Sequence, residues 1–268
     1  MGIVAVCTAG GTIGSTTTSL LMAAMAPAGH ATLLTECDPS GGDVAAWAEL
    51  PVSPGWSSAV AGSDRSWAAI KAHAQALPTG LRVMTSPARE FEARTAISEA
   101  ARGFGDLLVS IPDVVTVADC GRMAGEPSAW AVKARLTLLL LRQGTAQATV
   151  ARVDRTREAV ESLRPYCRQI GVVLIGASPY PVRAVEQALG LPVFGLLPED
   201  RVGAELVAGA WTVGKRASRS PLARAAGPLM ARVLEAMYGR HWNSPLGAAG
   251  VGGFAETGGE SKADEVGA

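Results

Sequence analysis

A glycine-rich stretch near the N-terminus, AGGTIGSTTT over residues 9–18, joins an apolar run to a stretch of helical pattern. Gly10, Gly11 and Gly14 let the backbone approach an anion closely, and backbone N–H groups at the start of a helix point at such an anion. The hydroxyl of Thr16 is of the type that binds magnesium beside a phosphate. The stretch therefore predicts a phosphate-binding turn between a strand and a helix.

Two carboxylates follow apolar runs further along the chain. Asp38 lies in TECDPSGGD and Asp119 lies in VVTVADCGR, each directly after a predicted strand. Because the carboxyl ends of parallel strands meet at one edge of a sheet, we expect both side chains beside the glycine-rich turn. Asp38 is the candidate catalytic residue, which would position a water beside a phosphate, and Asp119 is a candidate magnesium ligand together with Thr16. Asp-Pro-Ser-Gly is also a strong turn sequence, so capping of a turn is the alternative for Asp38.

Short apolar runs alternate with stretches of helical pattern along most of the chain. Several of the runs are continuously apolar, which is typical of strands covered on both faces. They span residues 3–8, 31–37, 81–85, 114–118, 136–141, 171–175 and 193–197, and the helical patterns span 15–26, 64–76, 90–102, 154–164 and 181–189. The alternation predicts an α/β fold with a mostly parallel sheet of about seven strands and helices on both faces.

The composition is that of an ordinary folded protein. The chain has 268 residues, of which 48% are apolar and 18% charged, and its formal net charge is zero. These values argue against disorder of the whole chain and against bulk attraction to nucleic acid or acidic lipid. No window of about eighteen residues is uninterruptedly apolar, so we expect no direct membrane insertion. The four cysteines lack CxxC spacing, which suits a reducing compartment, and we expect a cytoplasmic protein.

The C-terminal part changes character twice. Segment 211–241 carries six basic residues against one acidic residue, and a helix is predicted over about 221–238 because apolar residues recur on one face. From residue 242 onward the sequence is rich in glycine, alanine and acidic residues. We expect one domain over 1–241 and a disordered tail over 242–268.

These features together resemble the ParA/MinD family of ATPases, whose deviant Walker A loop reads KGGxGKT[ST]. In that family the second strand ends in an Asp-Pro-rich switch and a later strand ends in an aspartate. Over about residues 2–235, the segments GVVLIG, LGLPVFGLLPED and AELVAGAWTVGKRASRSPLARAA match the family's closing strands, base loop and last helices in order. The resemblance implies a P-loop NTPase fold with ATP and Mg²⁺ as cofactors. It places the nucleotide on Gly10, Gly11, Thr12, Ile13, Gly14, Ser15, Thr16 and Thr17.

The departures from the family pattern include both of its lysines, a glycine replaced by Thr12, and an asparagine missing after GVVLIG. Ser15 stands at the position of the phosphate lysine, and Gly10 stands at that of the signature lysine that reaches across the dimer. A charge-assisted hydrogen bond of this kind is worth about 1.5 to 3 kcal/mol, so weak or lost ATP binding and hydrolysis are expected. Arg122 and Arg142 are alternative cations close to predicted strand ends.

The resemblance implies a positioning or regulatory protein, similar to septum-site-determining or pilus-localising MinD-like proteins. We expect it to dimerise and to recruit a protein partner in septum placement, chromosome partition or a pilus or secretion apparatus, and a partner would bring it to a membrane or pole. Non-specific DNA binding through 211–241 is an additional hypothesis. The alternatives are an active ATPase with a rearranged site and an iron–sulfur carrier that uses Cys7, Cys37 and Cys120, which follow or end predicted strands.

Overall fold

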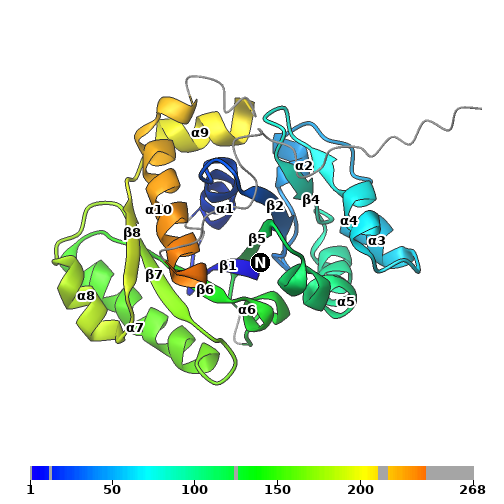
Figure 1. Ribbon diagram of the computed structural model, residues 1–268. Coiled ribbons are helices and arrows are strands. Elements are labelled where there is room, and N and C mark those ends of the chain that lie inside the picture. Colours follow the sequence, from blue (N-terminus) through cyan, green and yellow to red (C-terminus); the bar gives the residue numbers. More distant parts are fainter. Residues whose placement is uncertain (1, 12–13, 124–125, 211–216, 240–268) are drawn as a thin grey trace, which may run out of the picture.

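A β-sheet lies at the centre of the molecule (Figure 1). The computed structural model describes residues 2–11, 14–123, 126–210 and 217–239. Within these residues eight strands pair in the order β3-β4-β2-β5-β1-β6-β7-β8. All neighbouring strands are parallel except β3 and β4. The strands are β1 (Gly2–Thr8), β2 (Ala31–Glu36), β3 (Gln75–Ala76), β4 (Arg82–Met84), β5 (Val114–Arg122), β6 (Leu136–Arg142), β7 (Ile170–Ile175) and β8 (Val193–Leu197).

Helices cover both faces of this sheet. The central strand β1 shows why, because Val4 and Val6 point into one core and Ile3, Ala5 and Cys7 point into another. The helices are α1 (Ser15–Ala24), α2 (Val44–Trp47), α3 (Trp56–Ala61), α4 (Trp67–His73), α5 (Glu90–Ser110), α6 (Ala129–Lys133), α7 (Ala146–Leu163), α8 (Val182–Leu189), α9 (Arg201–Ala210) and α10 (Pro221–Tyr238), with a 3₁₀ turn at Ala217–Arg219.

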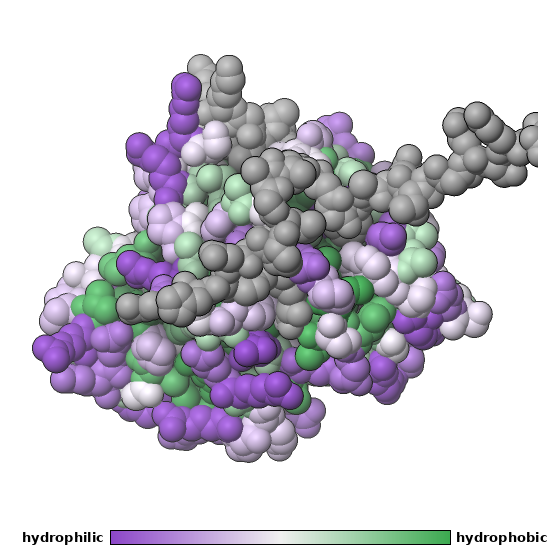
Figure 2. Space-filling view, viewed as in Figure 1, coloured by the Kyte–Doolittle hydropathy of each residue, from purple (hydrophilic) through white to green (hydrophobic). Residues whose placement is uncertain are grey.

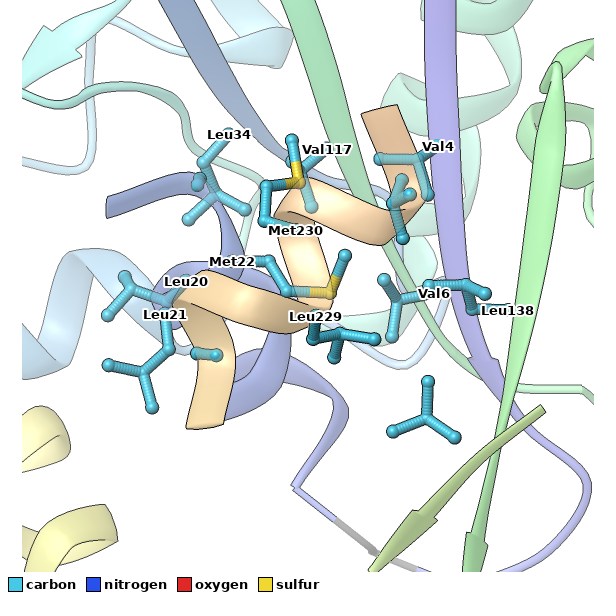
Figure 3. Packing of buried hydrophobic residues seen from close by; sticks show 14 of the residues in the cluster. Val4, Val6, Leu20, Leu21, Met22, Leu34, Val117, Leu138, Leu229 and Met230 are labelled. Carbon is cyan, nitrogen blue, oxygen red and sulfur yellow. The ribbon is translucent and has the colours of Figure 1, made fainter. Parts of the chain in front are cut away.

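The core between α1, α10 and the sheet fixes the helix that follows the glycine-rich turn. Three successive residues of α1 and two of α10 meet side chains from β1, β2, β5 and β6 (Figure 3), and all of them are buried. The residues labelled there are Leu20, Leu21, Met22, Leu229, Met230, Val4, Val6, Leu34, Val117 and Leu138. Burial of each large apolar side chain contributes about 1.5 to 3 kcal/mol, so α1 is held firmly against the strand that precedes it.

The predicted α/β fold is confirmed, and the differences are local. Each of the seven predicted runs contains a strand. The helical pattern predicted over 64–76 was wrong at its end, because α4 ends at His73 and the short antiparallel β3 follows; two residues carry no periodicity that could signal a strand. The helices α2, α3 and α6 were also not predicted. The predicted end of β5 at residue 118 was wrong, because this strand runs from Val114 to Arg122 and Asp119 lies inside it. A register irregularity next to Asp119 lets the strand continue while its direction is adjusted.

Several predictions fall on residues outside the described ranges. These are Thr12 and Ile13 of the glycine-rich stretch, residues 211–216 and 240–241 of the basic segment, and the expected tail 242–268. No helix in the described part of the chain is long and apolar enough to cross a membrane. Hydrophilic residues predominate along the lower edge of the molecule as viewed in Figure 2.

Candidate functional site

The glycine-rich turn keeps a backbone that only glycine adopts readily. Gly11 and Gly14 have φ angles of +73° and +75°, in the left-handed region. The Thr8 hydroxyl donates to the Gly11 carbonyl at 3.2 Å, which ties the turn to the end of β1. Gly14 precedes α1, and none of the described side chains caps the first N–H groups of this helix. Those N–H groups are therefore oriented towards the turn as donors for an anion.

Asp119 lies directly against the start of α1. Its buried carboxylate accepts a hydrogen bond from the backbone N–H of Gly121 at 3.3 Å. Burial raises the pKa of Asp119 to about 6, and the nearby hydroxyls of Thr16 and Ser15 and the Gly121 N–H offset part of that effect. Ser15 thus places a neutral hydroxyl near Asp119 at the position where the family pattern has a lysine.

Asp38 lies on the same edge of the sheet. Its carboxylate accepts a 2.8 Å hydrogen bond from the Ser40 N–H, which is the turn that its sequence predicts. The carboxylate also lies so close to Gly121 that a Cβ at that position would overlap it, and Gly121 has a φ of +60°. Partial burial raises the pKa of Asp38, the Ser40 contacts and Arg122 lower it, and its charge also acts on Asp119. Both readings of Asp38 are therefore compatible with its position.

Glu36 is a buried carboxylate that sequence reasoning missed. Its Oε1 accepts from the N–H groups of Asp43 and Val44 at 2.8 and 2.7 Å, and its Oε2 accepts from the Ser86 N–H at 3.0 Å. Burial raises the pKa of Glu36 to about 7 despite these contacts. The loop that carries Asp38 is thereby anchored at both ends, by β2 before it and by Glu36 after it. A charged residue that ends an apolar strand was the available signal.

The three cysteines at strand ends do gather beneath the site. The thiol of Cys120 lies near both Cys7 and Cys37; the neighbouring Cys120 and burial raise the pKa of Cys7, and burial raises that of Cys37. Across residues 2–11, 14–123, 126–210 and 217–239, no three His, Cys, Asp or Glu side chains are arranged to hold a metal ion. The thiols therefore act as small buried apolar groups here, and this geometry does not favour the iron–sulfur alternative.

The candidate cations differ in their surroundings. Arg142 forms an ion pair with Glu199, and Arg122 lies near Asp38 and lowers its pKa. In the basic segment, Arg232 of α10 donates to the Phe194 carbonyl at 3.0 Å, so it has a structural contact. Neither Arg122 nor Arg142 has a described contact with the glycine-rich turn.

The residues present fit a magnesium–nucleotide at this edge, apart from the lysines. A hydroxyl from Thr16 and a carboxylate from Asp119 are hard oxygen donors, and Mg²⁺ is bound in proteins by one or two such groups together with phosphate oxygens. The glycines at 10, 11 and 14 leave the backbone open to close approach. Thr17 lies in the first turn of α1, and no described contact links its hydroxyl to Asp38 or Asp119.

Comparisons with solved structures identify the fold as ParA/MinD-like. The chain is similar to the septum site-determining protein MinD of Pyrococcus horikoshii complexed with Mg-ADP, at 15% identity over 86% of this chain and 95% of that chain, with a TM-score of 0.66. It is similar to a ParA family ATPase from Chlorobium tepidum, at 16% identity over 86% and 97%, with a TM-score of 0.67. It is also similar to the MinC:MinD cell division protein complex of Aquifex aeolicus, at 12% identity over 87% and 96%, with a TM-score of 0.64. No protein-family model and no curated protein sequence matches the chain.

Proposed function

We propose that the chain binds a magnesium–nucleotide at the turn between β1 and α1 and acts as a ParA/MinD-like positioning or regulatory protein. The observation that carries this proposal is the position of the Thr16 hydroxyl near the buried Asp119 carboxylate, beside a turn in which Gly11 and Gly14 keep left-handed backbones. Support comes from the fold and from a structural neighbour that holds Mg-ADP. Magnesium, when bound, would neutralise phosphate charge at this edge.

Each residue of the candidate site has its own role in this proposal. Gly10, Gly11 and Gly14 provide backbone close to the phosphates, and Thr16 and Asp119 hold the metal. Asp38 orients a water molecule beside the terminal phosphate. Glu36 keeps the loop of Asp38 in place through three backbone hydrogen bonds. Ser15 provides no positive charge, so charge that develops on the phosphates meets less stabilisation.

We therefore expect the protein to hydrolyse ATP very slowly or not at all. Phosphate release should be barely detectable in the presence of magnesium and unchanged in its absence. Magnesium-dependent turnover at ordinary enzymatic rates that Asp38→Ala abolishes would instead support the second candidate, an active ATPase with a rearranged site. Asp106→Ala is the control, because this exposed carboxylate pairs with Lys133 and lies outside the residues assigned to the site.

Action through a homodimer and a protein partner completes the proposal. One structural neighbour is MinD in complex with MinC, which supports a protein partner from division, partition or a pilus or secretion apparatus. The dimer would be constitutive or form on weak nucleotide binding, in the cytoplasm, with recruitment to a membrane or pole by the partner. Light scattering with and without Mg-ATP tests the dimer, and a monomer under both conditions would contradict it. Electrophoretic mobility shift tests DNA binding through 211–241.

A further inference from the structure

An arginine from α7 lies against the glycine-rich turn. The Nη1 atom of Arg155 is 3.8 Å, and its Cδ atom 3.9 Å, from the position that a Cβ at Gly10 would occupy. Gly10 is the residue that stands where the family loop has its signature lysine. A guanidinium from a different element therefore lies within ordinary van der Waals distance of that position. A positive charge is present at the turn although the turn itself has no lysine.

The other two arginines of α7 are engaged in structural contacts. Arg152 donates to two backbone carbonyls at the end of β6, at 3.1 and 3.0 Å. Arg157 pairs with Asp154 at 3.0 Å. Arg155 donates only its Nε to the Ala151 carbonyl of its own helix, at 3.3 Å. Among the described residues no carboxylate pairs with Arg155, and its two Nη groups have no hydrogen-bond partner there.

We propose that Arg155 is the cation that contacts the phosphates of a nucleotide bound at this turn, in place of the missing lysines. The inference rests on the proposed nucleotide binding and adds the residue that supplies the charge. A guanidinium presents several N–H donors in a planar fork that matches phosphate oxygens, and such charge-assisted hydrogen bonds are among the strong ones.

The test compares Mg-ADP binding to the full chain and to three variants by calorimetry. Arg155→Ala should weaken Mg-ADP binding about tenfold or more, and Arg155→Lys should keep part of the affinity. Arg157→Ala removes the same charge two residues further along α7 and should bind Mg-ADP as the parent does. Adenosine, which has no phosphate, should bind the parent and Arg155→Ala equally. Circular dichroism checks that each variant is folded.

A variant that places the positive charge at a different position makes the test sharper. In the double variant Gly10→Lys with Arg155→Ala, the cation moves from α7 to the turn, and affinity for Mg-ADP should rise above that of Arg155→Ala. Equal Mg-ADP affinity in the parent and Arg155→Ala would overturn the inference while leaving the proposed function intact. A folded parent that binds neither Mg-ADP nor Mg-ATP would overturn the proposed function and the inference with it.

Discussion

The carboxylate of Glu36 accepts a 3.0 Å hydrogen bond from the backbone N–H of Ser86, and so joins the loop after β2 to the loop after β4. The other oxygen of the same carboxylate accepts from Asp43 and Val44, at the start of α2. One buried acidic side chain therefore fixes the path of the chain on both sides of Asp38. Both the loop geometry and its dependence on pH follow from this contact.

The free energy of unfolding should fall as pH rises, and Glu36→Gln should reduce that slope. The pKa of Glu36 is about 7 in the folded protein against 4.5 as the ordinary value, so the folded state holds a proton that the unfolded state has released in this window. The stabilisation is complete below the ordinary pKa and is lost as pH rises to about 7, and it amounts to roughly 3 kcal/mol. Urea unfolding at several pH values between about 4 and 8 measures the slope. Equal slopes in the parent and Glu36→Gln would contradict the prediction.

Gly121→Ala should destabilise the protein more than an alanine at another left-handed glycine. Alanine at Gly121 is strained by the φ of +60° and overlaps Asp38, so we expect a loss of about 3 kcal/mol. Gly190→Ala is the control, because Gly190 has a φ of +63° but meets only the end of the Arg164 side chain, and about 1 kcal/mol is expected. Denaturant midpoints compare the two variants, and similar losses would show that Asp38 moves aside freely.

Thr35→Val should cost about 1 to 3 kcal/mol, because it leaves a buried donor without its acceptor. The indole Nε1 of Trp56 donates to the Thr35 hydroxyl at 2.8 Å, and both side chains are buried. Thr116→Val is the matched control, since the buried Thr116 hydroxyl has no hydrogen-bond partner in the described part of the chain. That variant should be neutral or slightly stabilising by thermal unfolding. A larger loss of stability for Thr116→Val than for Thr35→Val would contradict the prediction that the Trp56–Thr35 hydrogen bond stabilises the fold.

Ser15→Lys should strengthen Mg-ATP binding about tenfold or more, because one charge-assisted contact is added beside the phosphates. The Ser15 hydroxyl lies near Asp119, so the new ammonium should also lower the pKa of this carboxylate. Thr16→Ala in the same background should reverse much of the magnesium-dependent part of the gain. Calorimetry on the parent and the two variants measures it. An unchanged affinity would mean that the turn no longer has a phosphate-binding shape.

The sequence alone determined the elements that have strong periodicity or punctuation. The apolar run before Gly10 and the helical pattern after Gly14 predicted β1, the turn and α1 correctly. Buried parallel strands are nearly continuous apolar runs, so the sheet could be predicted as well. The convergence of Asp38 and Asp119 on the turn followed from parallel topology, which brings all strand ends to one edge. The roles assigned to these residues stay predictions.

Tertiary structure alone decided which side chains meet. The position of Arg155 beside Gly10 depends on how α7 packs beside β6, and a helix residue so distant in sequence gives no local signal of it. Burial likewise decided the high pKa of Glu36, because the cost of desolvation depends on everything packed around the carboxylate. Local sequence sets backbone preference, whereas the distance between remote side chains results from the packing of the whole sheet and its helices.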